Sequence, residues 1–179
     1  DDRLAALHKA VAIEPRLGNA RRKLAAALTE LKRFDAAREV VQQGLERLGD
    51  EPELHLLSFW IDRTAGDLPG SRQRLRELLD EHPDFEEGWH RYLSFCEEEG
   101  QSDAILALQG KPPECLADSA VLRAYAADAE WQRGKRDAAV ALLRQALRLD
   151  PGYDYARDRL AELLLVMQRP RLVLEVLAD

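Results

Sequence analysis

The sequence predicts an all-α protein that repeats one pair of helices along its length. Residues 120–133 place Val121, Tyr125 and Ala129 on one face, with the spacing of three and four residues that is typical of an amphipathic helix. Residues 137–150 carry a second apolar stripe with the same spacing. Two helices of this length cannot bury both apolar faces against each other alone, so the pair is expected to stack on further copies of itself.

Glycine, aspartate and proline mark the ends of these two helices. Gly134 follows the first helix, where glycine adopts the left-handed conformation at little cost. Asp137 is expected to cap the second helix through its carboxylate. Pro151 is expected to end that helix, because it disfavours helical conformation at Asp150. These residues predict a helix–turn–helix unit.

The same markers recur with a period of 34 residues. Counting back from Pro151 in steps of 34 reaches Ala117, Pro83, Gly49 and Pro15, and the same step links Gly134 to Gly100 and Gly66. This period divides the chain into four full repeats between two partial ones, which predicts about eleven helices and no strands. The full repeats are 18–51, 52–85, 86–119 and 120–153, while residues 1–17 hold the second helix of a partial repeat and residues 154–179 form a partial last repeat.

The apolar columns of these units resemble the tetratricopeptide repeat, a helix–turn–helix of 34 residues. The columns are carried by Trp89, Tyr92, Leu93 and Gly100 in one repeat, and by Gly134, Ala139, Leu143, Ala146 and Pro151 in the next. The resemblance implies a single right-handed α-solenoid over residues 1–179, with Trp89 as a packing residue. It also implies a scaffold or adaptor that binds a peptide or partner segment in its concave groove.

Two segments depart from the regular pattern. The turn 65–71, which contains Gly66, Pro69 and Gly70, is expected to be the loosest in the chain. The helix that starts near Asp103 meets Gly110 and Pro112 after about two turns, so residues 111–118 are expected in extended or turn form. This irregular segment is either a tolerated departure or a bend or docking notch on the convex side.

The repeats at the two ends are incomplete. Residues 1–13 are expected to form a second helix that Pro15 terminates, which suggests a truncated N-terminus. Residues 154–168 are expected to form a first helix, and residues 171–178 start another without a polar capping helix after it. One expectation is therefore self-association through the last helix. The alternative to the binding module is a helical accessory or substrate-recruiting region of a larger enzyme, because similar repeats are found fused to glycosyltransferase, sulfotransferase or oxygenase domains.

The resemblance also assigns groove residues, because the second, fifth, ninth and twelfth places of each first helix face the groove in that family. Trp60 holds a ninth place and Trp131 a twelfth. Large aromatic side chains with a polar N–H are typical anchors for a bound chain, although each could instead cover a neighbouring helix. The candidate groove residues are Arg22, Leu56, Trp60, Arg63, His90, Glu97, Asp128, Trp131, Asp158 and Glu162.

The candidate groove is expected to be basic at one end and acidic at the other. Arg22 and Arg63 supply the basic end, whereas the acidic residues Glu97, Asp128, Asp158 and Glu162 dominate further along. Such a field would orient an extended ligand.

The groove is not expected to bind chaperone C-termini in the way that co-chaperone tetratricopeptide domains do. That carboxylate clamp needs two asparagines, at places that Ala26 and Leu57 occupy in this chain. Asn19 is the only asparagine in the sequence, so no register can supply both.

Composition argues against nucleic acid as the main partner and against a membrane span. The 179 residues are 46% hydrophobic and 33% charged, with a net charge of −7 and a pI near 5.2. No basic surplus exists to neutralise nucleic-acid phosphates. No stretch approaches the roughly 20 apolar residues of a membrane span. Cys96 and Cys115 are expected to be free thiols, which favours a reducing compartment, the cytoplasm.

Catalytic, metal and cofactor motifs are not found in the sequence. Its four histidines, His8, His55, His82 and His90, have no metal-ligand spacing with one another or with the cysteines. No glycine-rich phosphate loop or Gly-x-Ser-x-Gly elbow is present. We therefore expect neither enzyme activity nor a cofactor. The run 97–99 places three glutamates in the last turn of a helix, where the dipole disfavours them; it is either a solvated surface or a site.

Overall fold

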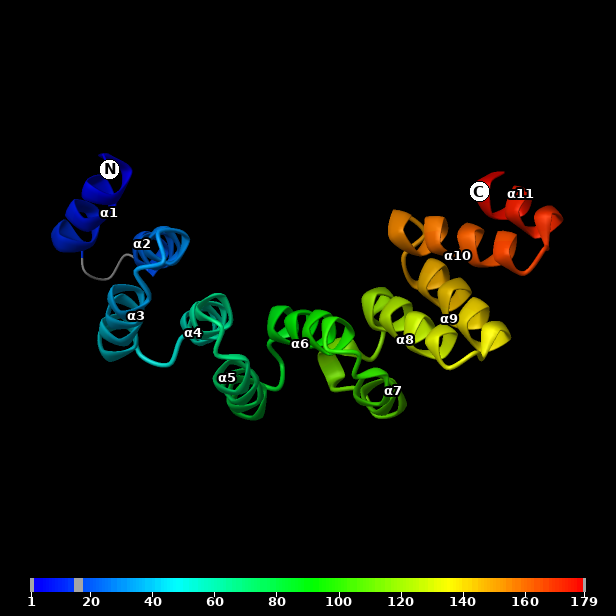
Figure 1. Ribbon diagram of the computed structural model, residues 1–179, viewed down its shortest axis with the longest axis horizontal. Helices are drawn as coiled ribbons and strands as arrows, with labels where there is room; N and C mark the ends of the chain where they lie inside the picture. Colours follow the sequence, from blue (N-terminus) through cyan, green and yellow to red (C-terminus); the bar gives the residue numbers. More distant parts are fainter. Residues whose placement is uncertain (1, 15–17, 179) are drawn as a thin grey trace. The chain divides into compact units, whose positions relative to one another are not determined.

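The computed structural model describes residues 2–14 and 18–178, and within these ranges it contains eleven α-helices, one 3₁₀-helix and no strand (Figure 1). The prediction of an all-α protein built from helix–turn–helix pairs is therefore confirmed. The chain forms two compact units, Asp1–Gly88 and Trp89–Asp179, which we describe separately.

The first unit holds five complete helices around one apolar core. The helix α2 packs against both α3 and α4, and α4 packs against α5. Buried leucine, valine and isoleucine side chains fill the space between these helices, among them Leu24, Val41, Leu54 and Ile61. The predicted stop at Pro15 lies outside the described residues. The helices are α1 (Asp2–Ile13), α2 (Gly18–Glu30), α3 (Phe34–Leu48), α4 (Pro52–Ala65) and α5 (Leu68–Glu81).

The connection between α4 and α5 is tight, contrary to the prediction of a loose turn over residues 65–71. Only Gly66 and Asp67 lie between the two helices, and Gly66 has a φ of +89°. The Asp67 carboxylate caps α5 by accepting a hydrogen bond from the N–H of Gly70 over 2.9 Å. A Cβ on Gly70 would collide with that carboxylate, so the glycine is part of the cap. A cluster of glycine and proline that indicates a loop can therefore also begin a helix.

The second unit continues from α6 to the end of the described chain. The apolar side chains of α7 and α8 pack together, as do those of α9, α10 and α11. Two buried clusters result, one around Leu93 and Leu122 and the other around Leu143 and Leu160. The elements are α6 (Glu86–Glu98), α7 (Ser102–Gly110), η1 (Glu114–Leu116), α8 (Ala120–Gln132), α9 (Arg136–Leu149), α10 (Asp154–Val166) and α11 (Pro170–Ala178).

The irregular segment after α7 completes the core rather than leaving a notch in it. The helix stops at Gly110, and residues 111–118 contain only the short η1 turn. Leu116 on this turn is fully buried against Leu93 and Ile105. Leu116 fills the space that a further turn of α7 would occupy. The early end of α7 therefore leaves no gap in the core, and the irregular segment is a tolerated departure from the repeat.

The observed ends of α8 and α9 agree with those predicted from the sequence, except at the N-terminal cap of α9. Gly134 has a φ of +78° after α8, and α9 ends at Leu149 just before Asp150. Asp137, however, does not cap α9, because the helix already begins at Arg136. The Asp137 carboxylate instead lies 3.1 Å from Nη2 of Arg169, at the end of the following repeat's first helix.

Two further expectations concern the surface and the cysteines. Cys96 and Cys115 are not joined in a disulfide, in agreement with the prediction, and Cys96 is buried. On α11, Leu174 and Leu177 are 71% and 58% exposed. In the described parts of the chain, no helix is long and apolar enough to span a lipid bilayer.

Candidate functional site

Three of the predicted groove residues in the first unit meet in one shallow hollow, which we call the Trp60 hollow. Trp60 and Leu56 come from α4, and Arg22 comes from α2, the first helix of the preceding repeat. The hollow measures about 440 Å³. Its full lining is Arg22, Glu53, Leu56, Leu57, Trp60 and Glu87. The helical period explains the grouping, since residues 53, 56, 57 and 60 share one face of α4.

Trp60 is partly exposed to solvent and packs on one side against a buried aromatic ring. Its side chain is 36% exposed, and its ring packs edge-on against the buried ring of Phe59, with 5.5 Å between the centroids. Charged side chains stand around it: Arg22 Nη1 lies 4.0 Å from the Glu53 carboxylate, and both side chains are partly exposed. The hollow thus combines an apolar floor with a charged rim.

In the second unit, predicted groove residues meet in a polar cluster that we call the Asp128 network. Nε of Arg159 donates to Oδ1 of Asp128 over 2.6 Å, and the hydroxyl of Tyr155 donates to Oδ2 over 2.6 Å. Nη1 of Arg159 also donates to the Glu162 carboxylate over 2.6 Å. The network therefore joins α8 to α10, the first helices of two consecutive repeats.

The charge of Asp128 is compensated within this network, whereas Glu97, Asp158 and Glu162 are exposed, so the acidic end of the groove stays a prediction. Asp128 is only 5% exposed, and Arg159 neutralises it. Burial alone would lower the pKa of Arg159, but its hydrogen bonds to Asp128 and Glu162 raise that pKa above its usual range. Burial, followed by the neighbouring Asp128 charge, raises the pKa of Glu97 on α6. Burial and the hydrogen bond to Asp128 likewise raise the pKa of Tyr155.

The other predicted groove residues lie apart from these two clusters. Trp131 is half-buried, packs against the apolar cluster of α9 and α10, and has the Arg136 guanidinium 5.5 Å above its ring centroid. Trp131 therefore covers a neighbouring helix, which was the alternative to a role as an anchor for a bound chain. Arg63 and His90 are half-buried, and Asp158 is exposed on α10.

Comparison with known proteins agrees with this architecture. Residues 4–58 match the family model of the tetratricopeptide repeat. The chain has the fold of tetratricopeptide-repeat proteins. No curated protein sequence matches it.

Solved structures share the tetratricopeptide-repeat fold at low sequence identity. PilF of Pseudomonas aeruginosa is 16% identical with a TM-score of 0.68, over 90% of this chain and 75% of PilF. Yeast Tom70 is 14% identical with a TM-score of 0.75, over 97% of this chain and 37% of Tom70. Human IFIT1, solved as a dimer with m7Gppp-AAAA, is 16% identical with a TM-score of 0.65, over 97% of this chain and 43% of IFIT1. The chain thus spans less than half of the latter two proteins.

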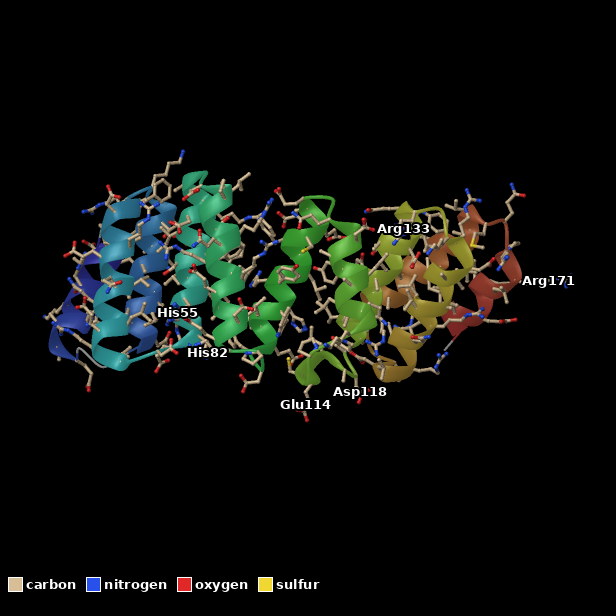
Figure 2. All side chains as sticks on the ribbon, turned by 90° about the horizontal axis from the view of Figure 1, so that it is seen from below. His55, His82, Glu114, Asp118, Arg133 and Arg171 are labelled. Carbon is tan, nitrogen blue, oxygen red and sulfur yellow. The ribbon has the colours of Figure 1, made fainter. Side chains whose placement is uncertain are left out.

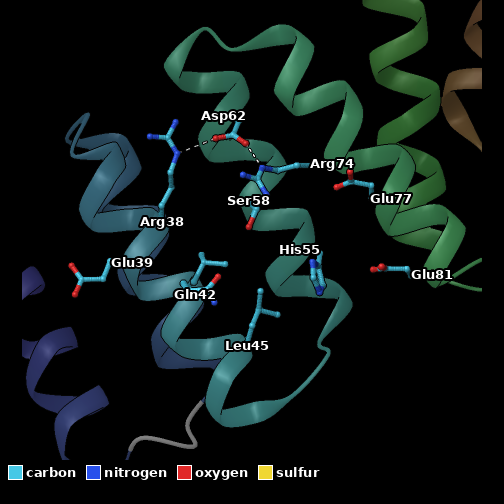
Figure 3. Close-up of a pocket in the computed structure, with 11 residues that line it drawn as sticks. Arg38, Glu39, Gln42, Leu45, His55, Ser58, Asp62, Arg74, Glu77 and Glu81 are labelled. Atoms are coloured by element: carbon cyan, nitrogen blue, oxygen red, sulfur yellow. Dashed lines mark hydrogen bonds and ion pairs between the residues drawn. The ribbon is translucent and has the colours of Figure 1, made fainter.

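A buried aspartate that the sequence analysis missed lies on the other side of α4. Asp62 is 3% exposed; it accepts a hydrogen bond from Nε of Arg38 over 3.1 Å and pairs with Nε of Arg74 (Figure 3). These residues lie at one end of a hollow of about 470 Å³ between α3, α4 and α5. Asp62 holds an eleventh place, where the tetratricopeptide pattern asks for an apolar residue. That mismatch is the sequence signal that could have found it.

A second missed cluster brings together Asp50, His55, Glu81 and His82. The two histidine rings lie 6.2 Å apart, centroid to centroid, and both are labelled at the same edge in Figure 2. Spacing along the chain gave no indication of the cluster, because the residues come from the α3–α4 connection, α4 and the end of α5. Only the packing of α4 against α5 brings them together.

Proposed function

We propose that this chain is a protein-interaction module that binds a peptide or an extended segment of a partner on the face formed by α2 and α4, the first helices of the repeats in the first unit. The observation that carries the proposal is the Trp60 hollow, where an exposed indole stands over an apolar floor within a charged rim. Aromatic anchors in such surroundings dominate binding free energy at protein interfaces. Scaffolding, rather than catalysis, is the activity that this surface supports.

The hollow's lining suggests the chemistry of the segment it takes. Leu56 and Leu57 favour an apolar or aromatic side chain of the ligand, packed beside Trp60. Arg22 offers a cation to a neighbouring ligand carboxylate, and Glu53 and Glu87 offer anions to a ligand cation. A short amphipathic segment with charges on both sides of one large apolar residue therefore fits best.

Protein, not nucleic acid, is the proposed class of partner. The IFIT1 structure contains a capped RNA, so the fold alone does not exclude RNA. The net charge of −7 does argue against it, because nucleic-acid affinity depends on cations that displace condensed counterions.

A peptide selection followed by calorimetry tests the proposal. We expect a displayed random-peptide library to yield ligands of the stated pattern. Trp60→Ala should weaken their binding by about 2 kcal/mol or more and leave the helical circular dichroism unchanged. Leu68→Ala is a matched control, because Leu68 is an exposed apolar residue of the same unit outside the hollow. Undiminished binding by Trp60→Ala, or Trp60-dependent binding of an AAAA oligoribonucleotide instead of peptide, would contradict the proposal.

We also propose that a second copy of the chain contacts α11. Leu174 and Leu177 present an exposed apolar stripe three residues apart on that helix. Sedimentation of the chain should show mass that rises with concentration, and Leu174→Glu should hold it at the monomer value. A monomer at all concentrations would refute this proposal.

A further inference from the structure

Four side chains with metal-binding chemistry converge at one edge of the first unit. Asp50 lies in the α3–α4 connection, directly after Gly49, whose φ of +92° turns the chain there. His55 lies in the first turn of α4, while Glu81 ends α5 and His82 follows it. Three separate segments thus supply one cluster.

The distances suit a single shared ion. One ligand atom each from Asp50, Glu81 and His82 lies within 4.8 Å of the others. Oδ2 of Asp50 is 3.1 Å from Nε2 of His82. In a tetrahedral zinc site with bonds of about 2.0 to 2.2 Å, ligand atoms lie roughly 3.4 Å apart. One of the required separations is therefore already present, and rotation of the exposed Glu81 side chain can supply the remaining approach.

Contacts within the protein account for only part of the cluster. His55 Nε2 lies at hydrogen-bonding distance, 2.8 Å, from Oδ1 of Asp50. His82 Nε2, in contrast, is shielded from solvent and makes no hydrogen bond of acceptable geometry. Among the residues that the structure describes, Glu81 has no ion-pair partner. Two carboxylates lie in the cluster, and a divalent cation would balance their negative charge.

We propose that Asp50, Glu81 and His82 bind one divalent transition-metal ion, such as Zn²⁺. The imidazole ligand favours this class over Ca²⁺ and Mg²⁺, which prefer sites made entirely of oxygen ligands. His55 does not bind the ion itself. Its hydrogen bond to Oδ1 orients the Asp50 carboxylate, as residues that hydrogen-bond to metal-bound carboxylates commonly do. The ion would tie the α3–α4 connection to the end of α5.

One of the three proposed ligands, Glu81, borders a cavity. His55 and Glu81 line the far end of the 470 Å³ hollow that contains Asp62 (Figure 3). A water molecule can therefore reach the ion from the hollow, and so can a side chain of a bound partner. Three protein ligands and one open position are the arrangement found in zinc sites that exchange a ligand.

Zinc titration of purified, metal-free chain tests the proposal. We expect one equivalent of Zn²⁺ to bind in calorimetry and to raise the melting temperature. Glu81→Gln and Asp50→Asn keep the side-chain shapes at exposed positions and should each weaken binding at least tenfold, as should His82→Ala. His55→Ala should weaken it less than His82→Ala. His8→Ala is the control, since His8 is an exposed histidine on α1 outside the cluster.

Cobalt provides a readout that a merely structural cluster would not give. Co²⁺ bound by one imidazole and two carboxylates should produce visible absorption bands that disappear in His82→Ala. Cys115→Ser should leave these bands unchanged, which separates the proposed site from thiol binding in the second unit. Absence of stoichiometric Zn²⁺ binding, or binding that His82→Ala and Glu81→Gln both leave intact, would overturn the proposal.

Discussion

Arg159 on α10 donates from Nε to the carboxylate of Asp128 on α8 over 2.6 Å, so that two consecutive repeats share one ion pair, in which Asp128 is buried and Arg159 partly exposed. Asp128 also accepts the hydroxyl of Tyr155, and both of its oxygens are therefore used. The pair lies on the face assigned to ligand binding, yet its hydrogen bonds are made within the protein. It serves to hold α10 against α8.

Asp128→Ala should destabilise the second unit by about 2 to 3 kcal/mol. The substitution leaves the Arg159 guanidinium without its main partner and the Tyr155 hydroxyl without its acceptor, and losing one member of a buried pair costs more than the pair contributes. Urea unfolding followed by circular dichroism measures the change. Asp158→Ala, at an exposed position on the same helix as Arg159, should stay within about 0.5 kcal/mol of the parent. Equal effects of the two substitutions would show that the network contributes nothing.

Glu97→Gln should stabilise the chain slightly at neutral pH. Burial, with the Asp128 charge as the second cause, raises the pKa of Glu97 in the folded state. An acid with a raised folded pKa contributes stability below its unfolded pKa and loses that contribution as the pH rises through the folded value. Glutamine removes this loss, although the gain should stay below about 1 kcal/mol because much of the carboxylate is exposed. Thermal melts at pH 7 and pH 4 should differ between variant and parent only at pH 7; a less stable variant at pH 7 would contradict the assignment.

Trp89→Ala should cost about 2 kcal/mol, less than full burial would imply. The sequence pattern placed Trp89 at a packing position, and the structure does pack it against the cluster of Leu93, with its ring edge-on to Tyr92 at 5.8 Å. The indole is nevertheless only half-buried, so its removal opens a smaller cavity than the loss of a core tryptophan. Urea unfolding measures the loss, and an unchanged midpoint would show that the contact is weak.

Residues that act within one repeat were predictable from the sequence. Gly134 and Pro151 marked helix ends correctly, because glycine and proline act on their own backbone. Trp60 and Leu56, four residues apart in the sequence, line the same hollow, because a helix fixes which residues share a face.

Residues that act between repeats were not predictable in the same way. The pattern assigned Asp128 to an open groove, but its environment is set by Arg159, 31 residues later. Likewise, nothing around Asp50 in the sequence indicates His82, which meets it only after α4 and α5 have packed. Leu116 re-enters the core from a segment whose prolines indicated only the end of a helix. In each case the deciding contact is tertiary, and local periodicity does not encode it.

The last prediction concerns whether the buried Asp62 carboxylate stabilises the folded chain. Asp62→Asn should destabilise by about 1 to 2 kcal/mol, since it removes the charge that pairs with Arg38 and Arg74 but leaves a buried polar group. Asp62→Leu places an apolar residue where the tetratricopeptide pattern favours one, and both arginines are exposed enough to turn toward water. Replacing a buried charge with a well-packed apolar side chain is often neutral or stabilising, so Asp62→Leu should be at least as stable as the parent chain. Urea unfolding of both variants decides the question. A leucine variant less stable than the parent chain would show that the ion pairs with Arg38 and Arg74 stabilise the fold and that stability explains why an aspartate stands at this position.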